Sequence, residues 1–384
     1  MRKNDVAKEP LIRFGEFELL KAIAIIGLPA IHLMEEAMEG GFASPELMRF
    51  GSLIIGLCVF GPSVFMICMG FGIGGGKTTA AGIRRNGIQF LLIGAILNIF
   101  RWFIPGIIQS FTLHTRLIED IEFCLQSDIY YFVGLFFILY SFLKKKDISA
   151  EGMLFISILM ITANMLLTPL TGKYITNPII ASLVGNIVYV NETSCFPLLS
   201  WAIFPSVGIL LGDLLKKSDE TKREFIMKRI FDFSFVLFAS FMVFLYQYDI
   251  DIMKVLVSPN NDYITDIPNV ILLVSCALFL ISLTYYLCKR IGNSSFMKFM
   301  LRVSVFIIPF YLLQWVIIAW IFYILPILRM PPGCFGVGWY LFSVIVVTAI
   351  CIFVSTRYGM KIMKILFKIT TIKKKRKKKL RVSE

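Results

Sequence analysis

The sequence predicts an all-α fold, a polytopic helical bundle integral to the membrane, with about ten transmembrane helices and both termini in the cytoplasm. Hydrophobic residues make up 57% of the 384 residues and the mean hydropathy is +0.78, above the roughly 45–50% apolar content of soluble proteins. The apolar runs have helical length and lack the alternation of barrel strands. Lys and Arg are enriched in every second loop, as the positive-inside rule requires.

The first half of the chain contains five predicted spans. They cover about 15–34, 52–72, 86–107, 129–143 and 152–170. The basic N-terminal segment is predicted to be cytoplasmic, and the glutamates after the first span place that loop outside. Lys77, Arg84 and Arg85 place the next loop inside, an acidic loop follows outside, and Lys144 starts a basic cluster inside.

The second half is oriented by one short apolar stretch, 179–190. If it crossed the membrane, the basic cluster after the next span would face outward, which the positive-inside rule disfavours. We therefore interpret 171–196 as one external segment with a re-entrant or interfacial piece. The remaining spans are predicted at about 197–215, 230–247, 267–287, 303–325 and 338–357.

The formal charge of +14 comes from short loops and from the C-terminal tail. We expect one transmembrane domain over 1–360 and a basic cytoplasmic tail over 361–384. Attraction to anionic membrane lipids explains such a tail more simply than nucleic-acid binding, so no nucleic-acid partner is expected. The eight cysteines show no C-x-x-C pair and predict no metal site, and a disulfide among Cys124, Cys195 and Cys334 stays open.

The first span contains the most informative residues. His32 lies at its outer end, and Glu35 and Glu36 follow at i+3 and i+4, on the same helical face. A lone histidine there would be read as a polar cap at the interface. A carboxylate on one ring nitrogen would instead fix the tautomer and raise the basicity of the other, as a general base needs. Lys21 lies roughly 16 Å away along the helix axis, in the other half of the membrane.

Further polar residues lie within the apolar helices. Asn98 and Arg101 share a face of the third span, and a buried arginine needs a partner, for which Asp128 and Glu35 are both candidates. Gln314 and Tyr311 have packing by interhelical hydrogen bonds as their default role. GGGKTTAAGIRR is not a P-loop, because the glycine required at position 71 is a phenylalanine and no strand precedes it.

Several of these motifs resemble those of transmembrane acyltransferases. Lys21 and His32 have the spacing of the Arg-x10-His signature of acyltransferase family 3 and of the heparan-alpha-glucosaminide N-acetyltransferase-like proteins. The first helix departs from their pattern with Glu18 for Asp, Lys21 for Arg and Ala22 for Gly. VFGPSVFMICMGFGIG (59–74), SDIYYFVGLFFIL (127–139), FPLLSWAIFPSVGILLGDLL (196–215) and VSVFIIPFYLLQW (303–315) are similar to later helices of these families, in the same order.

The resemblance implies an enzyme in the cell (plasma) membrane that takes an acyl group, expected to be acetyl, from cytosolic acyl-coenzyme A (acetyl-CoA). The implied acceptor is a hydroxyl or amine of an extracytoplasmic glycan or glycolipid, and no metal is needed. His32 would be the general base or a transient acyl carrier, oriented by Glu35 or Glu36. The implied donor-binding residues are all basic: Arg13, Lys21, Lys77, Arg84 and Arg85.

Two questions stay open from the sequence. The alternative function is a membrane transporter or lipid-handling protein, in which the intramembrane ionisable residues line a substrate path. Association into a homodimer is neither predicted nor excluded.

Overall fold

The computed structural model describes residues 14–58, 60–114, 124–125, 128–191, 194–248, 267–292 and 294–381. Within these ranges nearly all regular structure is helical, and the one β contact is an isolated bridge between Ala43 and Phe335. The helices are α1 (Gly15–Glu39), α2 (Pro45–Cys58), α3 (Gly61–Ile73), α4 (Ala80–Asn98), the π-helix η1 (Ile99–Phe103), α5 (Ile104–Leu113), α7 (Ile129–Lys145), α8 (Ala150–Tyr174), α9 (Pro178–Val184), α10 (Leu198–Trp201), α11 (Ile203–Lys216), α12 (Glu220–Gln247), α14 (Ile267–Ile291), α15 (Ser295–Val305), α16 (Ile307–Ile327) and α17 (Val337–Arg381).

The predicted all-α membrane bundle is confirmed. Among the described residues, eight helical segments are long and apolar enough to cross a membrane. They are Gly15–Glu39, Ala80–Leu113, Ala150–Tyr174, Leu198–Lys216, Glu220–Gln247, Ile267–Ile291, Ile307–Ile327 and Val337–Lys368. The shorter helix α7 corresponds to the predicted fourth span, and 179–190 contains only the seven-residue α9, too short to cross.

Three predicted spans are each divided into two helices, the sixth only by a single turn residue, Ala202, between α10 and α11. The second is divided into α2 and α3, with Pro62 in the first turn of α3. The ninth begins only at Ile307, after the separate helix α15, with Pro309 in its first turn. Proline lacks an N–H donor and fits best in the first turn of a helix, so each new helix begins just before one.

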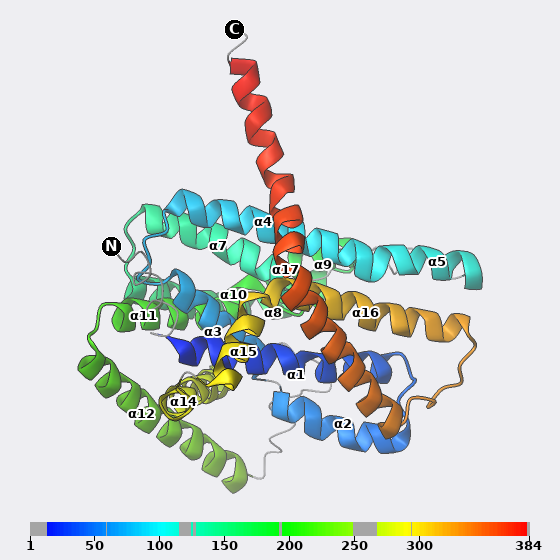
Figure 1. Ribbon diagram of the computed structural model, residues 1–384, viewed down its shortest axis with the longest axis horizontal. Coiled ribbons are helices and arrows are strands. Elements are labelled where there is room, and N and C mark those ends of the chain that lie inside the picture. Colours follow the sequence, from blue (N-terminus) through cyan, green and yellow to red (C-terminus); the bar gives the residue numbers. More distant parts are fainter. Residues whose placement is uncertain are drawn as a thin grey trace, which may run out of the picture.

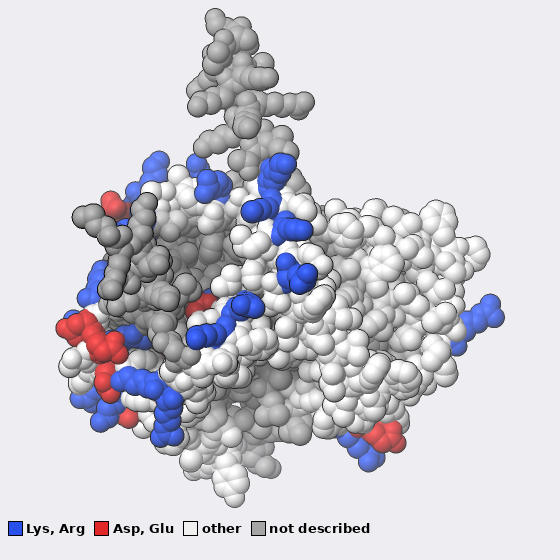
Figure 2. All heavy atoms as spheres, viewed as in Figure 1, with Lys and Arg blue, Asp and Glu red and all other residues white. Residues whose placement is uncertain are grey.

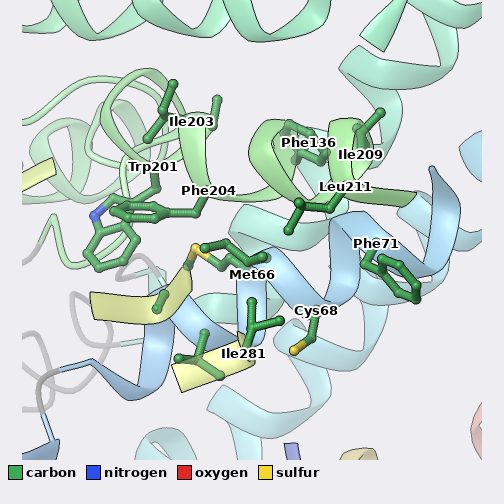
Figure 3. Packing of buried hydrophobic residues seen from close by; sticks show 14 of the residues in the cluster. Met66, Cys68, Phe71, Phe136, Trp201, Ile203, Phe204, Ile209, Leu211 and Ile281 are labelled. Carbon is green, nitrogen blue, oxygen red and sulfur yellow. The ribbon is translucent and has the colours of Figure 1, made fainter. Parts of the chain in front are cut away.

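Helix α1 is the central element of the bundle. It packs against α2, α3, α14, α15, α16 and α17, and Figure 1 shows it running through the middle of the helices. One hydrophobic core lies on the side of α3 and α11, where Met66 of α3 meets Phe204 and Leu211 of α11 (Figure 3). A second core surrounds the contact of α1 with α16 and α17.

Glycines bring α3 and α11 into close contact. Gly70 on α3 and Gly74 directly after it lie against the backbone of Pro205 and Ile209 on α11. Gly208 and Gly212 of α11 lie against Ile67 and Gly74 in turn, so both segments contribute a G-x-x-x-G pair. A Cβ atom at Gly208 would overlap the backbone carbonyl of Ile67. Small residues at this spacing allow helix backbones to approach closely, which is how membrane helices associate without a hydrophobic driving force.

The C-terminal end of α3 is held by one lysine. Lys216 at the end of α11 donates from Nζ to the carbonyls of Phe71 (2.6 Å), Gly72 (3.1 Å) and Gly74 (2.7 Å). These carbonyls have no partner within the helix, and a cation at a helix C-terminus is electrostatically favourable. The glycine loop after α3 is therefore fixed to α11.

The charged side chains lie mainly at one end of the bundle. Figure 2 shows Lys and Arg mainly on the left and centre of this face, while most of the right-hand part carries none. The start of α1 and the ends of α3 and α11 lie on the left in the same view (Figure 1). This arrangement agrees with the predicted grouping of the cytoplasmic loops.

Candidate active site

A cavity of about 280 Å³ lies beside α1 and joins Lys21 to His32. Its wall on α1 is formed by Lys21, Ile25, Leu28 and His32, which follow one stripe of the helix. The other walls come from α3, α7 and α16, with further residues of neighbouring segments. Almost all of these side chains are apolar, so the polar groups are concentrated at the two ends.

His32 is oriented by Glu35. Its Nδ1 lies 2.9 Å from Glu35 Oε2, and their side chains are 13% and 25% exposed. A carboxylate can only accept, so in the neutral imidazole this hydrogen bond assigns the ring proton to Nδ1 and leaves the lone pair on Nε2. Nε2 is buried and has no hydrogen-bond partner within the described part of the chain. The predicted spacing of a base and its orienting carboxylate is therefore present in three dimensions.

Trp315 lies between His32 and Arg101. The indole ring of Trp315 lies against the imidazole at a centroid distance of 3.8 Å, with the two ring planes inclined by 35°. The guanidinium carbon of Arg101 lies 3.3 Å from the centroid of the same indole and 4.3 Å from that of Trp102. Arg101 belongs to the π-helix η1, a local feature that is frequent at functional sites. The contact with Trp315 restricts the plane of the imidazole, and Arg101 places a cation close to the same indole.

Asp128 joins three helices at this end of the cavity. As the N-cap of α7 it accepts from the backbone N–H of Tyr130 (2.9 Å), and it also accepts from the hydroxyl of Tyr311 on α16 (3.2 Å). Arg101 Nη1 lies 3.5 Å from its Oδ2. Of the two candidate partners for Arg101, Asp128 is thus in contact, whereas Glu35 bonds to His32.

The remaining predicted residues near this end do not all face the cavity. Glu36 Oε1 lies 3.9 Å from Arg101 Nη2, so the two glutamates have different contacts. Asn98 donates from Nδ2 to the carbonyl of Cys124 (3.0 Å), which anchors a connecting segment. Gln314 is fully buried and neither polar atom of its side chain has a partner among the described residues. Neither Asn98 nor Gln314 lines the cavity.

The opposite end of the cavity carries Lys21. Its Nζ lies 2.8 Å from Glu18 Oε1, and Glu18 Oε2 accepts from the hydroxyl of Ser304 on α15 (2.6 Å). Arg13, predicted to act with Lys21, lies outside the described residues. Lys21 and Glu18 are two of the positions at which the first helix departs from the pattern it resembles. The two residues form an ion pair with each other.

A second buried ion pair ties the start of α1 to α12. Arg223 Nη2 donates to both carboxylate oxygens of Glu16, at 2.7 and 2.9 Å, and both side chains are almost fully buried. A buried charge is tolerated when it is paired in this way. Glu16 and Arg223 were not predicted as a pair, because 207 residues separate them.

Lys77, Arg84 and Arg85 lie outside the cavity. All three side chains are exposed, Lys77 in the loop after α3 and the arginines in the first two turns of α4. The cavity wall reaches Gly72, five positions before Lys77. These basic residues therefore belong to the surface near the Lys21 end.

Sequence reasoning missed Trp315 as part of the site and gave Tyr311 only a packing role. Both lie on α16, at i and i+4, in the stretch VSVFIIPFYLLQW. The hydroxyl of Tyr311 and the indole N–H of Trp315 are polar groups within a strongly apolar helix, and this was the sequence feature that could have indicated a role in the site. Within the described ranges, no three His, Cys, Asp or Glu side chains are grouped so that they could hold a metal ion.

Comparison with known proteins adds one finding. The family model described as an acyltransferase domain, of acyltransferase family 3, matches residues 14–357. No curated protein and no solved structure gives a significant match. The matched range begins one residue before α1 and covers every residue of the cavity.

Proposed function

Because the chain belongs to acyltransferase family 3 and is a multi-pass membrane protein, we propose that it transfers an acyl group from cytosolic acyl-coenzyme A to an extracytoplasmic acceptor. The acyl group is expected to be acetyl, from acetyl-CoA. The acceptor is a hydroxyl or amine of a glycan or glycolipid, and the membrane is the plasma membrane. The observation that carries the proposal is the cavity between Lys21 and His32.

The size and lining of the cavity support a thioester donor. A volume of about 280 Å³ is at the low end for small-molecule pockets, so it suits a narrow flexible chain and not a nucleotide. The nucleotide of coenzyme A would stay at the surface, where Lys77, Arg84 and Arg85 could bind its phosphates. Its pantetheine arm would enter past Lys21 and carry the thioester towards His32.

The chemistry at the other end follows from the lone pair on His32 Nε2. Nε2 removes the proton from the acceptor hydroxyl or amine, and the acceptor atom attacks the thioester carbonyl. The carbon–sulfur bond breaks, and the thiolate of coenzyme A takes the proton from the imidazolium. Glu35 stabilises that imidazolium, and the Arg101 guanidinium behind Trp315 contributes positive charge near the developing oxyanion.

The first experiment tests His32 directly. In purified protein reconstituted in nanodiscs, His32→Gln is expected to lower acetyl-CoA turnover by about 10²–10⁴-fold, the usual contribution of a general base. Release of coenzyme A thiol with a mixed envelope-glycan extract as acceptor measures turnover. The second histidine, His114, is exposed and remote from the cavity, so His114→Gln is the matched control. Equal activity in wild type and folded His32→Gln would rule out the proposed mechanism.

The same preparation distinguishes the two roles of His32. Radiolabelled acetyl-CoA without acceptor leaves label on the protein if the imidazole carries the acyl group, and leaves none if transfer is direct. Proton-coupled uptake of a solute into liposomes without acetyl-CoA would instead favour the transporter function. The family assignment favours the enzyme over the transporter.

A further inference from the structure

The last third of the chain has basic residues but no acidic ones. Between Asp266 and Glu384 there is no Asp or Glu, whereas Lys and Arg recur through α14, α15 and α17 and become dense after residue 372. Within the described residues, Lys289 is paired with Glu224 of α12. The excess of positive charge in this third makes anions from outside the chain its expected partners.

A wedge-shaped cavity of about 620 Å³ opens where α17 leaves the bundle. One wall is the junction of α15 and α16, and the other is the second half of α17. We call it the α17 wedge; it is lined by Val305, Phe306, Met360, Met363, Lys364, Phe367 and Lys368. At its closed end Gly359 packs on the Phe306 ring, and a Cβ there would lie 2.5 Å from a ring carbon. Beyond Gly359 the two walls separate.

Two lysines stand at the open side of the wedge. Lys364 and Lys368 are one turn apart on α17, so they share a face. Both side chains are exposed, and neither has an ion pair within the described part of the chain. The facing helices α15 and α16 contain no carboxylate. Figure 2 shows further Lys and Arg side chains along the path of α17.

The composition of the wedge fits an amphiphile better than a soluble anion. Its floor consists of Val305, Phe306, Met360, Met363 and Phe367, which favour an acyl chain over water. Its lysines follow the predicted apolar span 338–357, roughly 10 and 16 Å beyond its cytoplasmic end along the helix axis. That level corresponds to the surface of the membrane, where basic pockets between helices bind anionic lipid head groups.

We propose that the α17 wedge is a binding site for an anionic phospholipid. The phosphate lies between Lys364 and Lys368, and one acyl chain covers Met360, Met363 and Phe306. The bound lipid fills the gap between α17 and the first turn of α16, the helix that carries Tyr311 and Trp315. This inference concerns a site separate from the cavity and does not depend on the proposed acyl transfer.

The test compares lipid retention by the full chain. The protein is purified in a neutral detergent, exchanged into nanodiscs of phosphatidylcholine with or without phosphatidylglycerol, and examined by native mass spectrometry. Wild type is expected to retain phosphatidylglycerol. Lys364→Gln/Lys368→Gln is expected to weaken its apparent affinity about 30-fold, the equivalent of about 1 kcal/mol for each lysine near an anionic surface.

Two controls separate the wedge from general surface charge. Lys145→Gln/Lys146→Gln removes the same charge from exposed residues at the end of α7 and should leave retention unchanged. Lys364→Arg/Lys368→Arg keeps the charge and should also retain the lipid. An equal loss of phosphatidylglycerol retention in both glutamine variants would show that retention depends only on net charge, and would overturn the proposal.

Acyl-coenzyme A is the other anionic amphiphile that could fit the wedge. In nanodiscs of phosphatidylcholine alone, Lys364→Gln/Lys368→Gln should bind acetyl-CoA as wild type does, measured by calorimetry. A weaker affinity for acetyl-CoA with unchanged phosphatidylglycerol retention would assign the lysines to the donor and contradict the lipid site. Because lipid retention requires no turnover, its outcome is separate from that of the His32 experiment.

Discussion

At the scale of single residues, the imidazole of His32 is constrained from two directions. Glu35 bonds to its Nδ1, and Trp315 covers one face of the ring. The first contact sets the tautomer of the neutral ring and the second restricts its plane, so Nε2 is held in a buried position with no hydrogen-bond partner among the described residues. Such preorganisation lets a base act without first being reoriented.

Replacing Glu35 tests the first of these constraints. Glu35→Gln can still accept from Nδ1 but no longer stabilises a positive imidazolium. We expect turnover to fall about 100-fold, the low end of a general acid–base contribution, with little change in the KM for acetyl-CoA. The steady-state kinetics of acetyl-CoA turnover provide both values.

Glu46→Gln is the matched control, because Glu46 is exposed at the start of α2 and lies outside the cavity. A rise in KM with unchanged turnover in Glu35→Gln would contradict the orienting role. It would point to substrate binding instead.

The Arg101–Asp128 pair makes a prediction about stability. Arg101→Gln leaves a buried carboxylate without its cation and should destabilise the folded protein by about 3 kcal/mol. Arg101→Gln/Asp128→Asn should recover part of that loss, because only the more distant Glu36 carboxylate is then left without its cation. Thermal unfolding in detergent, followed by tryptophan fluorescence, compares the variants.

An exposed pair provides the comparison for this cycle. Lys217 Nζ lies 2.7 Å from Asp213 Oδ1, and the two side chains are 69% and 31% exposed. Its removal should cost less than about 1 kcal/mol. Similar costs for both pairs, or a double variant no more stable than Arg101→Gln, would show that Arg101 and Asp128 are not coupled.

At the scale of helices, the close crossing of α3 and α11 determines the position of α3, which forms one wall of the cavity. Met66 and Gly72 on α3 line the cavity, while Gly70 of the same helix and the following Gly74 pack on α11. One face of α3 is thus fixed by backbone contact, and its other face borders the space beside α1. A shift of α3 would change the width of the cavity.

Gly208→Ala should therefore be poorly tolerated. Its methyl group would overlap the carbonyl of Ile67, and separating the two helices should cost about 1–3 kcal/mol. Gly27→Ala is the matched control, since a Cβ at Gly27 meets no atom within 4 Å. A melting temperature lowered in Gly208→Ala and unchanged in Gly27→Ala is the expected result, and equal values would contradict it.

The sequence predicted the helices better than their breaks. Long apolar runs and loop charges were sufficient to predict most spans, because a membrane selects for both. Pro62 and Pro309 divide two of those runs, and a window of hydropathy averages over such residues. The seven-residue α9 was recognised as non-spanning only because the next basic cluster would otherwise face outward.

At the scale of the whole molecule, the cavity is the feature that unites distant segments. The pairing of His32 with Glu35 could be predicted because both lie within one helical turn. Trp315 and Arg223 could not, because their partners lie on helices far away in the chain and no pattern in one sequence joins them. Exposed residues such as Lys77 were predicted to bind the donor from their charge alone. Their part in donor binding stays a proposal.

A substitution at Gly72 tests whether the cavity is the path of the donor. A Cβ at Gly72 meets nothing within 4 Å, and Gly72 lines the cavity. Gly72→Leu should therefore fill part of the path without displacing backbone, and should lower acetyl-CoA turnover by at least about tenfold at unchanged thermal stability. Turnover should fall because the added side chain would keep the thioester from reaching the position from which it can react.

Gly27→Leu places the same side chain in open space outside the cavity and should leave turnover unaltered. Full activity in Gly72→Leu would mean that the donor reaches His32 by another route.

The ion pair between Glu16 and Arg223 bears on how the protein is assembled during synthesis. Glu16 emerges from the ribosome early, and its partner follows 207 residues later. Until α12 enters the membrane, the first helix carries a carboxylate without its counter-charge and cannot settle in its final place. Closure of the bundle around α1 is therefore a late, post-insertion event, and a nascent chain that stops before Arg223 has no route to the finished architecture.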